Sequence, residues 1–259
     1  MKKIYIRVGM ALITFVVLIS LCIGCKYLSK RNYSYYDMSI MKDGEETYKN
    51  GNYVVKMTKY VYDQKMQLAA AVFKITCDDG RKPEAYIHKS IEGNYIESFG
   101  ENNSMWFYGE NSRAEYKDNA IYIYYRTGRK MSDKTLGVED LLNIELFDYN
   151  YSPTTPVHKF KLKGTEEEIS IDVGGTDVVN ISSVGVKIKK EDFDNINSME
   201  IVFDNEKGKC IVDKETGYSI FTREINPDKM SDYEIGEFET PIDISKIKTL
   251  IVDSVEYDV

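Results

Sequence analysis

Past the N-terminal segment, short runs in which apolar and polar residues alternate fill the chain and predict strands. In the first run, Val55, Met57 and Val61 share one face. A polar turn at 63–65 then leads into residues 68–75, which are apolar almost throughout. Alternation with a period of two is typical of a half-buried strand, whereas a continuous apolar run indicates a strand covered on both faces. We therefore expect an antiparallel hairpin with a central second strand.

The same alternation recurs along the rest of the chain, and no window spaces its apolar residues as a helix would over three turns. Asp118 and Asn119 separate two alternating runs. In the second of these, Ile121, Ile123 and Tyr125 lie on one face, and Tyr122, Tyr124 and Arg126 lie on the other. The further predicted strands are 95–99, 105–109, 142–150, 158–164, 168–174, 178–190, 198–204, 209–213, 218–224, 233–243 and 248–259.

Short strands at intervals of about ten residues favour a β-sandwich. The Gly-Gly-Thr-Asp sequence at 174–177 is the best internal boundary, because the strand pattern restarts after it. We therefore expect an all-β fold of two consecutive Ig-like antiparallel β-sandwiches behind an N-terminal membrane helix. The expected parts are a transmembrane anchor or signal segment at 1–28, a polar spacer at 29–50, a first Ig-like sandwich at 51–174 and a second at 175–259.

The N-terminal segment is an apolar run without charge from Val8 to Ile23, preceded by the basic residues Lys2, Lys3 and Arg7. A signal peptide needs a basic start and a shorter apolar stretch, whereas a spanning helix needs about 20 apolar residues. The stretch from Val8 to Leu28 has 21 residues with one charge, Lys26, so both interpretations fit in length. We prefer an uncleaved single-pass helix, with lipid anchoring as the alternative and simple secretion as a third. All three place residues 31–259 outside the cytoplasm, the first two at the cell membrane.

Lipid anchoring is suggested by the sequence Cys-Ile-Gly-Cys at 22–25, which resembles a bacterial lipoprotein box. Gly24 is the small residue that such a box needs before the modified cysteine, so Cys25 is the candidate for lipidation. The sequence departs from the pattern at Cys22, where a leucine is usual.

Charge and composition set aside several chemistries. The chain has 34 basic and 42 acidic side chains, a net charge of −8, and its first 25 residues hold three basic and no acidic ones. Such a body repels phosphate backbones, so we expect no nucleic-acid partner. The two histidines, His88 and His158, and the two cysteines past the anchor, Cys77 and Cys210, are too few for a zinc site or an evident nucleophile. We expect both cysteines to be small buried hydrophobes, no catalytic residue, no metal and no cofactor.

Aromatic residues provide the one candidate ligand face. Sugars stack on aromatic rings, and an external sandwich could present such rings on a sheet. The alternative is that the tryptophan belongs to the core and the tyrosines cover a sheet edge. The candidate residues are Trp106, Tyr108, Tyr122 and Tyr124.

Three stretches resemble an uncharacterised extracytoplasmic Ig-like domain family that follows the membrane helix of bacterial anti-sigma-factor-like proteins. The segment 54–75 is similar to its opening hairpin, 178–190 to the start of its second domain, and 239–257 to its closing segment. The resemblance implies two Ig-like domains outside the membrane and no enzymatic activity. We expect this chain to lack the cytoplasmic sigma-binding part of the family, since only seven residues precede Val8.

These observations lead to one preferred function and two alternatives. We expect a membrane-anchored, non-catalytic protein of interaction or envelope-sensing type, held by its N-terminal segment, with an unknown protein or a cell-wall component as its partner. The first alternative is a lipoprotein-type carbohydrate or cell-wall binding module. The second alternative is a hydrolase, which would need His88 or His158 beside a serine or a carboxylate.

A Cys25→Ser variant distinguishes the two modes of anchoring. If the apolar run stays as a helix, the variant keeps its membrane association, and the intact mass changes only by the substitution. Mass spectrometry of the membrane-extracted protein checks this expectation. Loss of a diacylglycerol-sized adduct in the variant would instead establish lipidation.

Overall fold

The computed structural model describes the chain from Tyr36 onward with interruptions. The described residues are 36, 38–90, 93–101, 104–107, 111–126, 143–148, 156–164, 167–174, 178–204, 208–221 and 232–259. Residues 36–259 belong to one compact unit. The predicted anchor at 1–28, including Cys25, lies outside the described residues. Within the described residues, no helix has the length and apolar character that spanning a bilayer requires.

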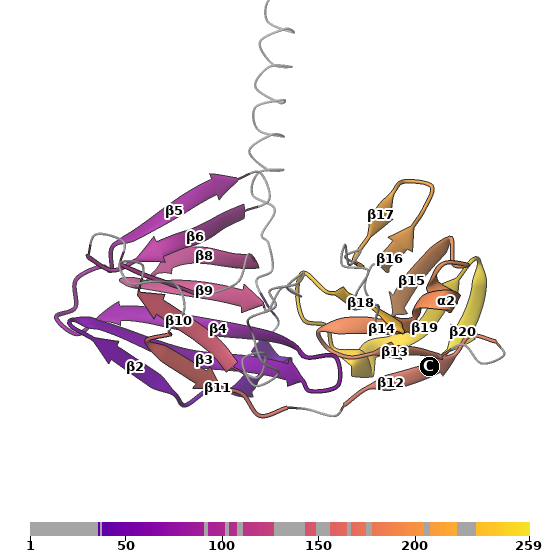
Figure 1. The fold of residues 1–259 in the computed structure, drawn as a ribbon, viewed down its shortest axis with the longest axis horizontal. Helices are drawn as coiled ribbons and strands as arrows, with labels where there is room; N and C mark the ends of the chain where they lie inside the picture. Colours follow the sequence, from indigo (N-terminus) through magenta and orange to yellow (C-terminus); the bar gives the residue numbers. More distant parts are fainter. Residues whose placement is uncertain are drawn as a thin grey trace, which may run out of the picture. The chain divides into compact units, whose positions relative to one another are not determined.

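The described chain is built almost wholly of antiparallel strands, as predicted, and they form four open sheets. The strands up to Lys161 and those from Ile169 onward form two separate groups (Figure 1). The first group consists of the short helix η1 (Met38–Ile40) and the strands β1 (Lys42–Asp43), β2 (Thr47–Asn50), β3 (Tyr53–Asp63), β4 (Leu68–Cys77), β5 (Ala85–Ser90), β6 (Gly93–Phe99), β7 (Met105–Phe107), β8 (Asn111–Lys117), β9 (Ala120–Arg126), β10 (Asn143–Asp148) and β11 (His158–Lys161).

The second group contains the remaining strands and two short helices. Its elements are β12 (Ile169–Asp172), β13 (Val178–Ile181), β14 (Gly185–Lys189), α2 (Lys190–Phe193), β15 (Ser198–Phe203), β16 (Lys209–Asp213), β17 (Tyr218–Ser219), β18 (Tyr233–Glu237), η5 (Ile244–Lys246), β19 (Ile247–Val252) and β20 (Val255–Asp258).

Two sheets in each group enclose one apolar core. Sheet A has the order β1-β3-β4-β9-β8, with β2 also paired to β3, and sheet B has the order β11-β10-β7-β6-β5. Phe73 of sheet A meets Phe107 and Phe160 of sheet B, with ring centroids 4.5 and 4.8 Å apart. Because side chains alternate along a strand, one face of each sheet supplies this core. We call sheets A and B the first sandwich.

Sheets C and D form the second sandwich in the same way. Sheet C has the order β12-β13-β14-β18, and sheet D has the order β17-β16-β15-β19-β20. Val186 and Ile188 of sheet C share a core with Ile201 and Leu250 of sheet D, and all four side chains are fully buried. Each sandwich therefore has its own apolar core.

The chain follows nearly the same path through both sandwiches. Three consecutive strands form a meander in one sheet, β2-β3-β4 or β12-β13-β14, and the next three form a meander in the facing sheet. The chain then returns to the first sheet, where β9 lies beside β4 and β18 beside β14. A final hairpin extends the facing sheet. The paths differ at two places. Sheet A has the additional strands β1 and β8, and β10 joins the last strand of its meander whereas β19 joins the first.

Two tight turns explain how the sequence sets the register of these strands. Asp118 and Asn119, predicted to separate two strands, both have positive φ, as do Asp253 and Ser254 between β19 and β20. Two consecutive residues with positive φ form the type I′ turn that matches the twist of a hairpin, and Asp and Asn tolerate this conformation. The register that follows puts Ile121, Ile123 and Tyr125 into the first core, as predicted.

The structure differs from the predicted division of the chain at two places. Residues 42–50, expected within the polar spacer, contain β1 and β2, and both strands pair with β3. The expected boundary at 174–175 falls between β12 and β13, which are hydrogen-bonded to each other in sheet C. Because β12 belongs to sheet C, the division between the sandwiches lies before Ile169.

Candidate functional site

The most distinctive site in the described chain is the contact between the two sandwiches, which we call the junction. On β4, Leu68, Ala70 and Val72 are buried although they are not part of the first core. They alternate with the core residues of the same strand, so they lie on the outer face of sheet A. The prediction that residues 68–75 form a strand covered on both faces is therefore confirmed.

Gly185 fixes how closely the two sandwiches approach. It lies on the outer face of sheet C, because the neighbouring Val186 points into the second core. A Cβ atom at this position would lie 2.6 Å from Cδ1 of Leu68 and 2.5 Å from the carbonyl oxygen of Gly236. Only a residue without a side chain fits between sheet A and sheet C here.

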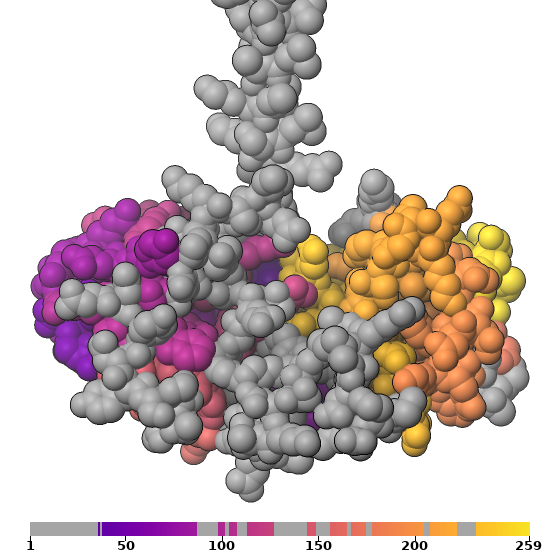
Figure 2. Space-filling model, turned by 45° about the horizontal axis from the view of Figure 1, so that its top comes forward, coloured from indigo at the N-terminus to yellow at the C-terminus, as the bar shows by residue number. Residues whose placement is uncertain are grey.

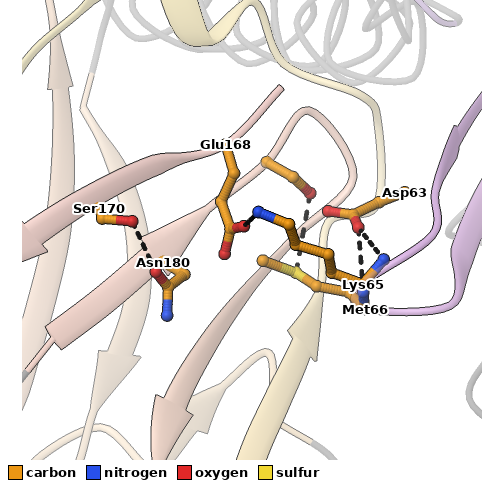
Figure 3. Close-up of polar contacts among 7 residues, drawn as sticks. Asp63, Lys65, Met66, Glu168, Ser170 and Asn180 are labelled. Atoms are coloured by element: carbon orange, nitrogen blue, oxygen red, sulfur yellow. Dashed lines mark hydrogen bonds and ion pairs between the residues drawn. The ribbon is translucent and has the colours of Figure 1, made fainter. Parts of the chain in front are cut away.

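The turn between β3 and β4 forms one end of the junction (Figure 3). Asp63 is buried, and its Oδ1 accepts hydrogen bonds from the backbone amides of Lys65 (2.8 Å) and Met66 (2.9 Å). These bonds hold the turn in shape, as Asp side chains often do in turns. Nζ of Lys65 then reaches Oε2 of Glu168 at 2.6 Å, and Oγ of Ser182 donates to Sδ of the buried Met66 at 3.7 Å. The turn thus contacts the second sandwich through both charged and apolar side chains.

A second polar group lies where β9 approaches β18. Nη1 of Arg126 donates to the carbonyl oxygen of Phe238 at 3.3 Å, and Nη2 of Arg113 lies 3.5 Å from Oε2 of Glu239. In the space-filling view, magenta atoms of the first sandwich lie directly beside yellow atoms of the C-terminal segment (Figure 2). Arg126 and Arg113 are on the outer face of sheet A with Tyr124, since the core residues of β9 alternate with them.

Tyr36, near the N-terminal end of the described chain, packs beside this second polar group. Its ring meets that of Tyr124 edge to face, with centroids 5.6 Å apart, and the two residues are only 6% and 4% exposed. The hydroxyl group of Tyr124 donates to Oε1 of Glu115 at 2.7 Å. Edge-to-face packing brings the positive edge of one ring against the negative face of the other. This attraction adds to the stabilisation that burial of the two rings provides.

Glu237 is a partly buried acid at the junction. Gly185 pairs with it across sheet C, so its side chain shares the outer face with Gly185. Among the described residues, its Oε1 atom is buried without a hydrogen-bond partner. Burial raises the pKa of Glu237 from its ordinary 4.5 to about 7, and the positive charge of Arg126 opposes this rise. Burial also raises the pKa of Tyr36, where Arg126 acts in the opposite direction and Glu237 adds to the rise.

The three predicted ligand-face residues that the structure describes do not share one face. Trp106 belongs to sheet B, where it stacks on Phe147 with centroids 5.1 Å apart. Tyr122 and Tyr124 are on the outer face of sheet A, and Tyr124 is buried in the junction. Tyr108 lies outside the described residues. The structure thus separates Trp106 from the two tyrosines, because the sandwich places β7 and β9 in different sheets.

The histidines have ordinary structural surroundings where they are described. His158 stacks on Tyr48 at 4.8 Å and packs edge to face on Phe160 at 4.6 Å. Its Nε2 lies 3.0 Å from Oε1 of Glu46, but the direction of this contact does not suit a hydrogen bond. His88 lies on β5, paired with Tyr95, and its side chain is outside the described part.

The two cysteines of the described chain are both free. Cys77 is buried at the edge of the first core, as expected, whereas Cys210 is exposed. The expectation that Cys210 is buried was wrong, because it alternates with Ile211 of the second core and so faces outward. In the described residues, no group of three or more His, Cys, Asp or Glu side chains is arranged to hold a metal ion.

Comparison with known proteins adds little to this picture. No protein-family model matches the chain. No curated protein matches it either. A conserved domain protein from Bacillus anthracis, known from a crystal structure, aligns with 84% of this chain and 79% of its own length at 8% identity and a TM-score of 0.33. A likeness at this level carries no argument about fold or function.

Sequence reasoning missed the residues that build the junction. Arg126 was placed on the correct face of its strand, but Glu237, Gly185 and Tyr36 were not singled out. One signal for the junction was available in the sequence. The strand at 68–75 is apolar on both faces, so another part of the protein had to cover its outer face. A glycine within an otherwise regular strand, such as Gly185, is the second signal, since it marks a close approach of another segment.

We expect Gly185→Ala to lower the free energy of unfolding by about 1–3 kcal/mol, because its new methyl group overlaps Leu68 and the Gly236 backbone. Urea denaturation measures this change, and Lys248→Ala on the exposed side of β19 serves as a control that changes it by less than about 0.5 kcal/mol. A Leu68→Ala/Gly185→Ala double variant should be non-additive by about 0.5 kcal/mol or more. Strict additivity would show that the two residues do not touch.

Proposed function

We propose that this chain is a membrane-tethered, non-catalytic interaction protein of envelope-sensing type, with residues 31–259 outside the cytoplasm. The tether is the uncharged apolar run from Val8 to Ile23, which basic residues precede. A binding protein of this type needs a rigid body that presents surfaces and loops. A unit of two packed sandwiches suits that task.

Strand order supports an Ig-like assignment for both sandwiches. In the first, β3-β4-β9-β8 faces β11-β10-β7, which follows the A-B-E-D and G-F-C arrangement of an Ig sandwich, with β5 and β6 added before strand C. In the second, β13-β14-β18 supplies A-B-E, and β20-β19-β15-β16-β17 follows G-F-C-C′-C″. Ig-like sandwiches serve many interaction proteins, although the fold alone does not specify a function.

The observation that carries the non-catalytic part of the proposal is how the buried polar side chains are used. Asp63 holds a turn, Arg126 bonds to the backbone of the other sandwich, and Tyr124 bonds to Glu115. Each of these groups has a partner within the fold itself. A hydrolase would instead need a nucleophile and a base directed at a shared reacting atom.

Cys210 provides a native probe for the proposed location. Its thiol is exposed, whereas Cys77 is buried. We expect a membrane-impermeant maleimide added to intact cells to label Cys210, because the second sandwich lies outside the membrane in this proposal. Mass spectrometry of the tryptic peptides locates the label.

The matched control for this labelling is Cys210→Ser, which should lose the label without changing the amount of protein in the membrane fraction. Labelling of Cys210 only after the cells are permeabilised would place the second sandwich inside and refute the proposal.

A cell-wall binding module stays as the second candidate because Trp106 and Phe147 form a stacked aromatic pair on the outer face of sheet B. If the preferred function is correct, Trp106→Ala leaves retention on cell-wall glycans unchanged. Affinity electrophoresis against a panel of such glycans tests this expectation, with Tyr122→Ala on sheet A as the control. Retention that Trp106→Ala abolishes and Tyr122→Ala preserves would favour the binding module instead.

A further inference from the structure

We propose that the junction is a proton-dependent latch, closed while the carboxyl group of Glu237 is neutral and loosened when that group ionises. This inference goes beyond the proposed function and does not rest on it. It depends on the position of one partly buried acidic side chain, that of Glu237, beside the contact between the outer faces of sheets A and C.

The position of Glu237 makes it part of the contact. It lies at the end of β18 beside Gly185, the residue against which Leu68 of the first sandwich packs. The next residue, Phe238, offers its carbonyl oxygen to Arg126 across the junction. Because Oε1 of Glu237 is buried at this contact, hydration of that atom requires a change in the contacts around it.

The groups around Glu237 do not neutralise its charge fully. Arg126 is the cation whose charge acts on it directly. Arg113 is drawn toward Glu239, which is itself exposed. The remaining titratable groups at this place are Tyr36 and Tyr125, whose phenols stay neutral because burial raises their pKa, and Lys209, whose ammonium group lies 5.0 Å from the Phe238 ring and whose pKa is lowered by burial.

The direction of the pH effect follows from the raised pKa of Glu237. Where the junction opens, the carboxyl group meets water and regains its ordinary pKa of 4.5, whereas in the closed state its pKa is about 7. Below the lower value both states are protonated, and the closed state carries no penalty. Between the two values the open state ionises first, so the closed state loses stability as pH rises. Above about 7 the loss is complete.

The N-terminal segment takes part in the latch through Tyr36. This side chain covers Tyr124 at the junction and is influenced by both Arg126 and Glu237. Loosening of the junction therefore also changes the surroundings of Tyr36, at the start of the folded unit.

Hydrogen–deuterium exchange of the full-length protein in detergent micelles tests the latch. Peptides covering 64–68 and 182–186 report on the junction, and a peptide covering β15 reports on the second core. The Glu237→Gln variant keeps the shape of the side chain but cannot ionise. At about pH 8 the junction peptides of the wild type should exchange at least about tenfold faster than those of the variant, and at about pH 5 they should exchange alike.

Glu239→Gln is the matched control, because it removes an exposed carboxylate at the same place and should keep the pH dependence of the wild type. An equal pH dependence in the wild type and in Glu237→Gln would overturn the latch. Faster exchange of the β15 peptide together with the junction peptides would also overturn it, since that result indicates unfolding of the whole protein.

Arg126→Gln provides a second variant in case Glu237→Gln fails to fold. It removes the positive charge that lowers the pKa of Glu237, so the closed state should lose more stability between about pH 5 and pH 8 than it does in the wild type. If the junction peptides of this variant speed up no more than those of the wild type over that interval, the result would count against the latch as strongly as the first one.

Discussion

The packing of sheet A against sheet C is the contact on which the rest of this structure depends. It explains why β4 is apolar on both faces, with Phe73 and Ile75 in the first core and Leu68, Ala70 and Val72 on the junction side. Burying a side chain such as leucine or valine contributes about 1.5–3 kcal/mol relative to leaving it in water. The two sandwiches therefore stabilise each other, in addition to what each core contributes to its own sandwich.

The polar groups at the same contact have a different effect. Removing Arg126 and Glu237 from water costs free energy that their mutual attraction offsets only in part. The ion pair between Lys65 and Glu168 is half exposed and adds little stability. Such groups restrict the orientation in which the apolar faces can meet, because each carboxylate or guanidinium group needs its partner in place. We regard the apolar contacts as the source of the strength of the junction and the polar ones as the source of its specificity.

Period-two alternation was sufficient to predict the antiparallel strands and the faces of β9, because strands with one buried face carry that pattern directly. It missed β1 and β2, which are short, largely exposed edge strands with no apolar face to reveal them. It also missed the junction, because the residues that meet there come from distant parts of the chain and share no local pattern. Glu237 looks like any charged residue in an alternating strand, and only the fold shows that a second sheet covers it. Nor does alternation show which strands share a sheet, and the structure places Trp106 and Tyr122 of the predicted aromatic face in different sheets.

Tyr36 gives the described chain a mechanical property. It is buried against Tyr124 before the chain enters the first strand of the sandwich. A pull on the chain at Tyr36 therefore acts on this ring pair before it can act on the edge strands β1 and β2. Strands cannot be peeled from that end of sheet A until the ring of Tyr36 leaves Tyr124.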